Sequence, residues 1–317
     1  MPTKIITKQL NNWYGLFSTG SAKTNNLPVM NDKKLFALIT LLDDPDDSVF
    51  RMVEQEILKE DATIVEKLEQ IWETSLDELI QSRIENLIRQ IQFNDTKEQI
   101  KKWSTQKTVD LFDGFFLISR YQYPDLKLKN INSRLDKITK DIWLEFNNSL
   151  TALEKITIVN HIIYDVHKFS VNHHNITSPQ NCYLNQLLET QKGNPVSLAI
   201  LYVLIARRLN LPVHIIDFPR NPLLAYFDPG IAELALGKNA GSPILFYINP
   251  SNKGAIVGKR EIDYFIRKNE AITNELVTTP CPDKIIIRKL LETLIQSYEE
   301  LGLQDKVDDL GEIASML

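Results

Sequence analysis

Residues 193–199, Gly-Asn-Pro-Val-Ser-Leu-Ala, open the helix that decides how this chain folds. Asn194 is a good N-cap, and Pro195 suits the first helical position, where a backbone N–H has no intrahelical partner. Asn210 can take the left-handed conformation that ends a helix, and Pro212 prevents further winding. One continuous apolar face lies between these ends, made by Leu198, Leu201, Tyr202, Ile205 and Leu209. The segment predicts a buried helix whose start offers no cysteine, so we expect no thiol catalysis there.

The period of the apolar residues changes directly after this helix. Short runs rich in β-branched and aromatic residues occupy 213–217, 222–227 and 244–248, separated by Pro, Gly and Asn. They predict an antiparallel sheet packed on the helix. The expected fold class is therefore α+β, mostly helical, with a buried helix on a small antiparallel sheet and helical regions on both sides in sequence.

These patterns divide the chain into four expected segments. Residues 1–30 have no sustained period and are expected to form an irregular tail. Residues 31–107 carry short amphipathic helices that resemble a HEAT array, with a plain helical bundle as the alternative. Residues 108–270 form the core, and 271–317 predict a helical hairpin similar to a tetratricopeptide-type unit.

Composition narrows the class of protein. The 317 residues are 43% hydrophobic and 24% charged, which fits an ordinary globular protein with a substantial core. We find neither an apolar run long enough to cross a bilayer nor a secretory signal, so we expect a cytoplasmic protein without a membrane partner. The net charge is −5 and no dense basic stripe with aromatics occurs, which argues against nucleic acid. Another protein is the expected partner, and the oligomeric state stays open.

Three ordered motifs surround the central helix: Tyr-Leu-Asn-Gln-Leu-Leu-Glu-Thr at 183–190, Gly-Asn-Pro-Val-Ser-Leu-Ala at 193–199, and Ala-Arg-Arg-Leu-Asn-Leu-Pro at 206–212. Together they resemble the SirB family, a branch of the transglutaminase-like superfamily of the core-2 type. The likeness extends less tightly from about 108 to 267 and includes Phe-Tyr-Ile-Asn-Pro at 246–250. The resemblance implies a transglutaminase-like, papain-like core across residues 108–270.

The superfamily uses a cysteine at a helix start, a histidine on the following sheet and an aspartate one strand later. This arrangement activates a thiolate and holds its imidazole base. By motif, the three positions here are Pro195, Asn221 and Asn249. Proline has no thiol, and an amide cannot act as a base near neutral pH. The resemblance therefore implies a degenerate triad and a protein without cysteine-transferase activity.

Ser197 is the remaining candidate nucleophile, with His214 and Asp217 near it in sequence. His214 and Asp217 lie three residues apart on one expected strand, so their side chains should point to opposite faces. Ser197 is more simply a serine hydrogen-bonded inside a helix start. Cys182, thirteen residues before the helix, and Cys281, between two prolines, lack a helix-start setting in sequence and are expected to be inert thiols.

A metal site could be suspected from the histidines His161, His167, His173 and His174. Their spacing does not match ligand pairs on a helix, so we expect neither a metal nor another cofactor. The leading hypothesis is a catalytically inactive transglutaminase-like protein that acts as a protein-interaction or regulatory module. The alternative is a residual hydrolase or transferase that uses an unmapped nucleophile such as Ser197, in a cleft near Asn221.

Overall fold

The computed structural model describes residues 32–42, 44, 46–218, 221–236, 243–268 and 277–317. The chain divides into two compact units, one ending at Ile91 and the other beginning at Gln92, and the division falls within α5 (Glu78–Ser104). The expected tail at 1–30 lies outside the described residues. The boundaries expected near 107 and 270 stay predictions.

The first unit is helical. It contains α2 (Asp32–Ile39), α3 (Asp47–Ile57), the 3-10 turn η1 (Ala62–Ile64), α4 (Val65–Thr74) and the beginning of α5. Its helices bury a core in which Leu42, Ile57, Leu68, Ile84 and Leu87 are fully inaccessible to solvent. Met52, Leu76 and Leu79, which their helical spacing predicts to be buried, are exposed instead. The helices therefore hold together through their own core.

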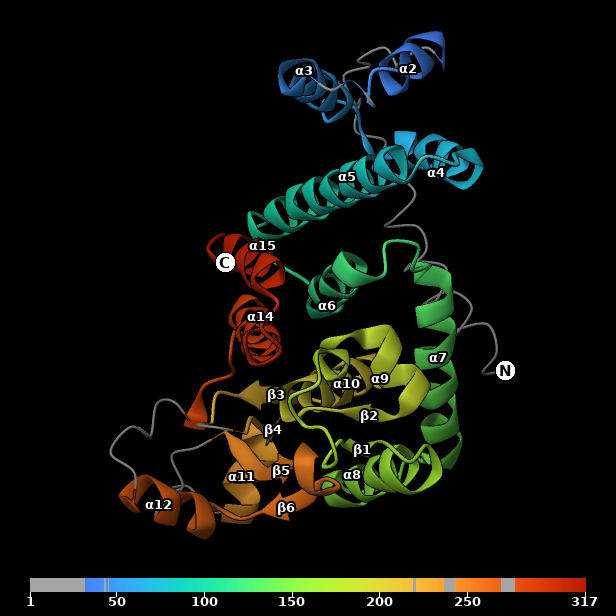
Figure 1. Ribbon diagram of the computed structural model, residues 1–317. Coiled ribbons are helices and arrows are strands. Elements are labelled where there is room, and N and C mark those ends of the chain that lie inside the picture. Colours follow the sequence, from blue (N-terminus) through green and yellow to red (C-terminus); the bar gives the residue numbers. More distant parts are fainter. Residues whose placement is uncertain (1–31, 43, 45, 219–220, 237–242, 269–276) are drawn as a thin grey trace. The chain divides into compact units, whose positions relative to one another are not determined.

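The second unit continues α5 and surrounds a central helix with further helices and a sheet (Figure 1). Before the central helix come α6 (Leu111–Gln122), α7 (Leu128–Glu145), α8 (Ala152–Asn160), the π-helix η2 (His161–Val166), β1 (Ser170–Val171), η3 (Pro179–Cys182), α9 (Leu184–Thr190) and β2 (Lys192–Gly193). After it come β3 (Val213–Ile216), β4 (Leu223–Phe227), α11 (Pro229–Leu236), β5 (Ile244–Asn249), η4 (Pro250–Asn252), β6 (Ala255–Val257), α12 (Lys259–Lys268), α14 (Asp283–Glu300) and α15 (Gln304–Ala314).

The central helix is α10 (Pro195–Arg208), and it begins where the sequence predicts. Every residue from Ser197 to Ala206 is buried, as expected for a helix that is apolar on all sides. Asn210 has φ of 55°, the left-handed conformation expected of the residue that ends the helix. The predicted start, burial and end of this helix are confirmed.

The sheet has the strand order β3-β4-β5-β6, and every neighbouring pair is antiparallel. Alternate residues on each strand enter two different cores. Ile215 and Leu224 pack in the large core that contains α10, whereas Ile216 and Ala225 pack in a second cluster with Ile262 of α12. The sheet therefore lies between α10 and α12, and the α+β fold class is confirmed.

Candidate functional site

The start of α10 is closed by a reciprocal capping box. The Asn194 side-chain oxygen accepts a hydrogen bond from the Ser197 backbone N–H at 2.8 Å, and Ser197 Oγ accepts one from the Asn194 N–H at 3.0 Å. Ser197 Oγ also donates to the Asn194 carbonyl at 3.1 Å, and the residue is 0% exposed. The serine hydroxyl is therefore fully used by the backbone of its own helix start.

Cys182 lies at this helix start, although the sequence separates the two. Asn194 Nδ2 donates to Cys182 Sγ at 3.0 Å, so the expectation that this thiol lacks a helix-start setting is wrong. The thiol is 0% exposed, and burial raises its pKa to about 12 despite the hydrogen bond from Asn194. It is protonated near neutral pH and out of reach of solvent, which fits the expected inert cysteine.

Asn221 and Asn249 mark the same end of two paired strands. Asn221 comes just before β4 and is exposed, and Asn249 is the last residue of β5. Because Leu224 is paired with Ile248, the antiparallel register brings the beginning of β4 beside the end of β5. The Pro219–Arg220 part of the matched motif lies outside the described residues.

The Asn249 side chain is engaged as a cap. Its oxygen accepts hydrogen bonds from the backbone N–H groups of Ser251 at 3.1 Å and Asn252 at 3.2 Å, which closes the turn η4. If an aspartate stood at position 249, its carboxylate could hold an imidazole only while it also accepted these two backbone hydrogen bonds. In this chain the position has a structural role.

Behind Asn249, a polar corner joins η4 and the residues that follow it to α8, η2 and α10. Tyr202 of α10 donates to Asn160 Oδ1 at 2.8 Å, and Asn160 Nδ2 donates to the Gly254 carbonyl at 2.8 Å. Tyr164 of the π-helix donates to the Pro250 carbonyl at 2.9 Å. Both tyrosines are buried, and burial raises their pKa values well above the usual range, so they act as permanent donors.

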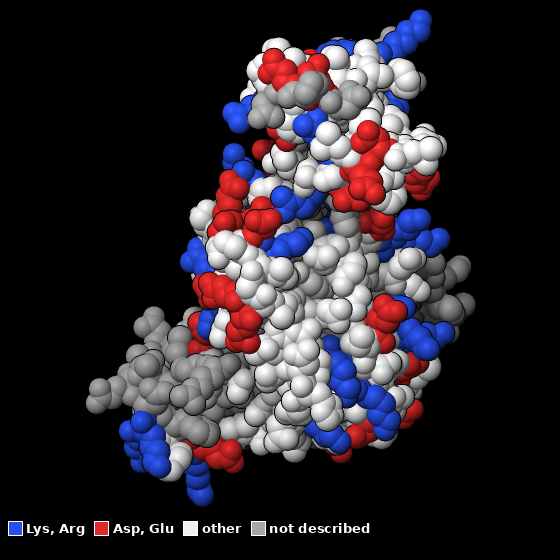
Figure 2. Space-filling view, in the orientation of Figure 1, with Lys and Arg blue, Asp and Glu red and all other residues white. Residues whose placement is uncertain are grey.

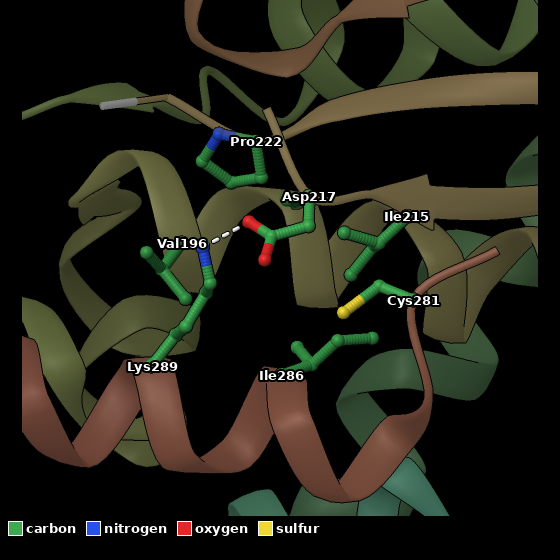
Figure 3. Close-up of a pocket in the computed structure, with 8 residues that line it drawn as sticks. Val196, Ile215, Asp217, Pro222, Cys281, Ile286 and Lys289 are labelled. Carbon is green, nitrogen blue, oxygen red and sulfur yellow. Dashed lines mark hydrogen bonds and ion pairs between the residues drawn. The ribbon is translucent and has the colours of Figure 1, made fainter. Parts of the chain in front are cut away.

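A small cavity lies beside the start of α10, between β3 and α14 (Figure 3). Its volume is about 10 Å³, enough for about one water molecule. Its lining includes an ion pair between Asp217 and Lys289, and burial raises the pKa of the nearby Cys281 thiol to about 11. The residues that line it are Val196, Ala199, Ile215, Asp217, Pro222, Cys281, Ile286 and Lys289.

This cavity adjoins two of the three degenerate positions, because Val196 follows Pro195 and Pro222 follows Asn221. It has no room for a peptide or a glutamine side chain. Sequence reasoning did not find the Asp217–Lys289 pair, since the two residues are 72 positions apart and no spacing connects them.

His214 is not part of a serine triad in this arrangement. Its ring packs edge-on against Phe227, with centroids 5.1 Å apart, and Phe227 packs on the cluster at the α12 side of the sheet. Asp217 lines the cavity on the α10 side instead. Burial and the nearby Arg207 charge lower the pKa of His214, which favours a neutral ring. The structure therefore does not bring Ser197, His214 and Asp217 together.

Two of the other histidines contact a carboxylate. His167 Nε2 lies 2.9 Å from Asp141 Oδ2, and His161 Nδ1 lies 3.4 Å from Asp165 Oδ2. Within the described ranges, no group of three or more His, Cys, Asp or Glu residues is arranged to hold a metal ion. In the same part of the chain, none of the helices has the length and apolar character needed to span a bilayer.

Comparison with known proteins identifies the fold family. A UPF0162 protein of Xylella fastidiosa is 26% identical over 218 residues, which is 64% of this chain and 72% of that protein. Human F-box only protein 21 is 24% identical over 218 residues, 62% of this chain and 33% of that protein. No solved structure matches the chain. The family model described as transglutaminase-like superfamily matches residues 129–292, more than half of the sequence. The chain belongs to the transglutaminase-like superfamily.

Proposed function

We propose that this chain is a non-catalytic transglutaminase-like protein that acts as a protein-interaction or regulatory module. The observation that supports this most directly is the state of Ser197 and Cys182, the hydroxyl and the thiol at the start of α10. Both are 0% exposed and both are hydrogen-bonded to Asn194 or its backbone. A nucleophile must meet a substrate atom, and neither side chain can do so without opening the helix start.

The degenerate positions support the same proposal. Pro195 supplies neither a thiol nor a backbone N–H for an oxyanion hole, and Asn249 caps η4. The cavity beside them is the size of a water molecule. The geometry gives no separate support to the alternative of a hydrolase based on Ser197, which the experiment below also tests.

The finer family assignment is part of this proposal. We infer a place in the SirB branch, with a HEAT-like first unit, a tetratricopeptide-like hairpin at α14 and α15, and a cytoplasmic location. Helical hairpins of this kind expose long faces that suit binding to proteins. Similarity to a protein named F-box only protein 21 also favours interaction over hydrolysis.

Turnover assays with matched variants test the catalytic half of the proposal. Purified protein is incubated with amine donors and glutamine substrates, and separately with ester and peptide reporters. We expect no product above a protein-free blank from the natural chain or from Ser197→Ala, Cys182→Ala and Asn221→Ala. Product formation that any one of these substitutions abolishes would overturn the proposal.

Ser197→Ala should change stability instead of activity. It removes the hydroxyl that accepts from the Asn194 N–H, so we expect the free energy of unfolding to fall by about 1 kcal/mol. Urea denaturation measures the change. Ser133→Ala, on the exposed side of α7, serves as the control and should stay within about 0.5 kcal/mol. Equal effects at the two sites would contradict the capping role.

The interaction half is tested by purification from native lysate. We expect a protein partner at a stoichiometric ratio, retained by Ser197→Ala and Cys182→Ala once these variants are shown to be folded. Recovery of the chain alone would count against an interaction module.

A further inference from the structure

The outer side of α7 carries an unusual group of cations in an acidic protein. Lys129, Arg134, Lys137 and Lys140 are all exposed, and no ion pair involves them among the residues that the structure describes. The helix also carries three carboxylates: Asp136 pairs with Arg208, Asp141 pairs with His167, and Glu145 is exposed next to Leu144. The four cations therefore leave a net positive charge on this side of α7.

Two large apolar side chains follow the four cations along α7. Trp143 is 50% exposed and Leu144 is 61% exposed, at the C-terminal end of α7. Exposed Trp and Arg are enriched on surfaces where proteins bind, because each supplies a large contact area there. We call Lys129, Arg134, Lys137, Lys140, Trp143 and Leu144 the α7 face.

The α14–α15 hairpin has the opposite charge and its own apolar anchors. Residues 299–312 contain six carboxylates and one cation. Leu301 is 58% exposed and Leu303 is 47% exposed at the turn between the helices. Glu299 and Glu300 are exposed beside them. Asp308 accepts a hydrogen bond from Gln304, and Glu312 pairs with Lys97 at the surface.

We call Glu299, Glu300, Leu301, Leu303, Asp308 and Glu312 the hairpin surface. When α15 is placed antiparallel to α7, apolar and charged groups follow each other in the same order along the hairpin surface and along the α7 face. From Leu303 the chain reaches Asp308 and then Glu312 over about 14 Å of helix. From Leu144 backwards, α7 reaches Lys137 and then Arg134 over about 15 Å. Apolar groups then oppose apolar groups, Asp308 opposes Lys137, and Glu312, which also pairs with Lys97 of its own chain, opposes Arg134.

We propose that a second copy of this chain is the occupant of the α7 face, through its hairpin surface. Acidic side chains gather over the part of the surface that carries α14 and α15, and basic side chains lie among acidic ones on the side that carries α7 (Figure 2). The contact is therefore head-to-tail, and each copy keeps one free surface for the next. This association does not depend on whether the superfamily site is catalytic.

The contact is small, so the expected dissociation constant lies in the micromolar range or above. Sedimentation velocity of the full chain at increasing concentration should show an average mass that grows past the dimer, and added salt should reduce it. Arg134→Glu with Lys137→Glu, and separately Asp308→Lys with Glu312→Lys, reverse groups that oppose each other in this register, and each pair should weaken association at least about tenfold. Arg267→Glu with Lys268→Glu on α12 makes the same charge change away from both surfaces and should leave association unaltered.

Mixing the two charge-reversed variants provides the decisive measurement. Each variant alone opposes like charges, but the acidic α7 face of one fits the basic hairpin surface of the other. We expect the mixture to regain association that neither variant shows alone. A chain that is monomeric at every concentration, association that survives both reversals, or a mixture that stays monomeric would overturn the proposal. Binding of the monomeric chain to anionic vesicles or to nucleic acid through the α7 face would also overturn it.

Discussion

In the Pro195→Cys variant, the new thiol should be alkylated at pH 7 about a hundredfold faster than Cys182 or Cys281. The position is the first residue of α10, where the helix dipole and free N–H groups lower the pKa of a thiol, and Pro195 is only half-buried. Burial raises the pKa values of Cys182 and Cys281 to about 12 and about 11. A thiol near pKa 7 has about 10⁴ times more thiolate, partly offset by its lower nucleophilicity.

Iodoacetamide labelling across a pH range, read by mass spectrometry at each cysteine, measures both the rate and the pKa. Ser133→Cys provides the matched control, because it places a thiol on an exposed helical position away from a helix start. Its pKa should be ordinary, near 8.5, and that of the thiol at 195 should be at least about one unit lower. Equal pKa values in the two variants would contradict the view that this helix start is the nucleophile position of the superfamily.

The local signals around α10 were sufficient to predict it from sequence. Asn194, Pro195 and Asn210 act within one turn of a helix end, and the left-handed Asn210 follows from local backbone preferences alone. The three predicted strands also occur, with ends that shift by a residue. The spacing of apolar residues predicts such elements because each helix or strand depends on residues that are close in sequence.

The contacts at the site depend on residues far apart in sequence, and these were not predictable. Cys182 meets Asn194 only because η3, α9 and β2 bring the chain back to the helix start. Lys289 meets Asp217 because α14 packs beside β3. The spacing of Ile156, Val159, Ile163 and Val166 predicts one continuous α-helix, whereas His161–Val166 forms the π-helix η2. Its Tyr164 finds a partner on η4 that no local pattern indicates.

The start of α3 shows that one sequence pattern can offer two capping residues. The run Asp44-Pro45-Asp46-Asp47 predicts a helix start with Asp44 as the cap. In the structure Asp46 is the cap of α3 and accepts from the Ser48 N–H at 2.8 Å. Asp44 accepts from the Asp46 N–H instead, so both carboxylates take part in the turn. Neighbouring Asp residues satisfy the same capping preference, so this preference alone does not decide which of them caps the helix.

Gly254→Ala should lower the free energy of unfolding by about 3 kcal/mol, for two separable reasons. Gly254 has φ of 72°, a conformation that a residue with a Cβ adopts only with strain, and an added Cβ would overlap the Asn160 amide. Asn160 cannot move freely, because it accepts from the buried Tyr202 hydroxyl and donates to the Gly254 carbonyl. Displacing it would leave Tyr202 without its acceptor in the core.

Two other glycines separate strain from overlap. Gly302 has φ of 70° but no atom within 4 Å of an added Cβ, so Gly302→Ala should cost only about 1 kcal/mol. Gly311 lies inside α15 with open space around it, so Gly311→Ala should stabilise the protein by about 0.5–1 kcal/mol. Urea denaturation of the three variants measures the series. A Gly254→Ala loss no larger than that of Gly302→Ala would mean that Asn160 yields, and that the polar corner behind Asn249 is not the rigid support that its hydrogen bonds indicate.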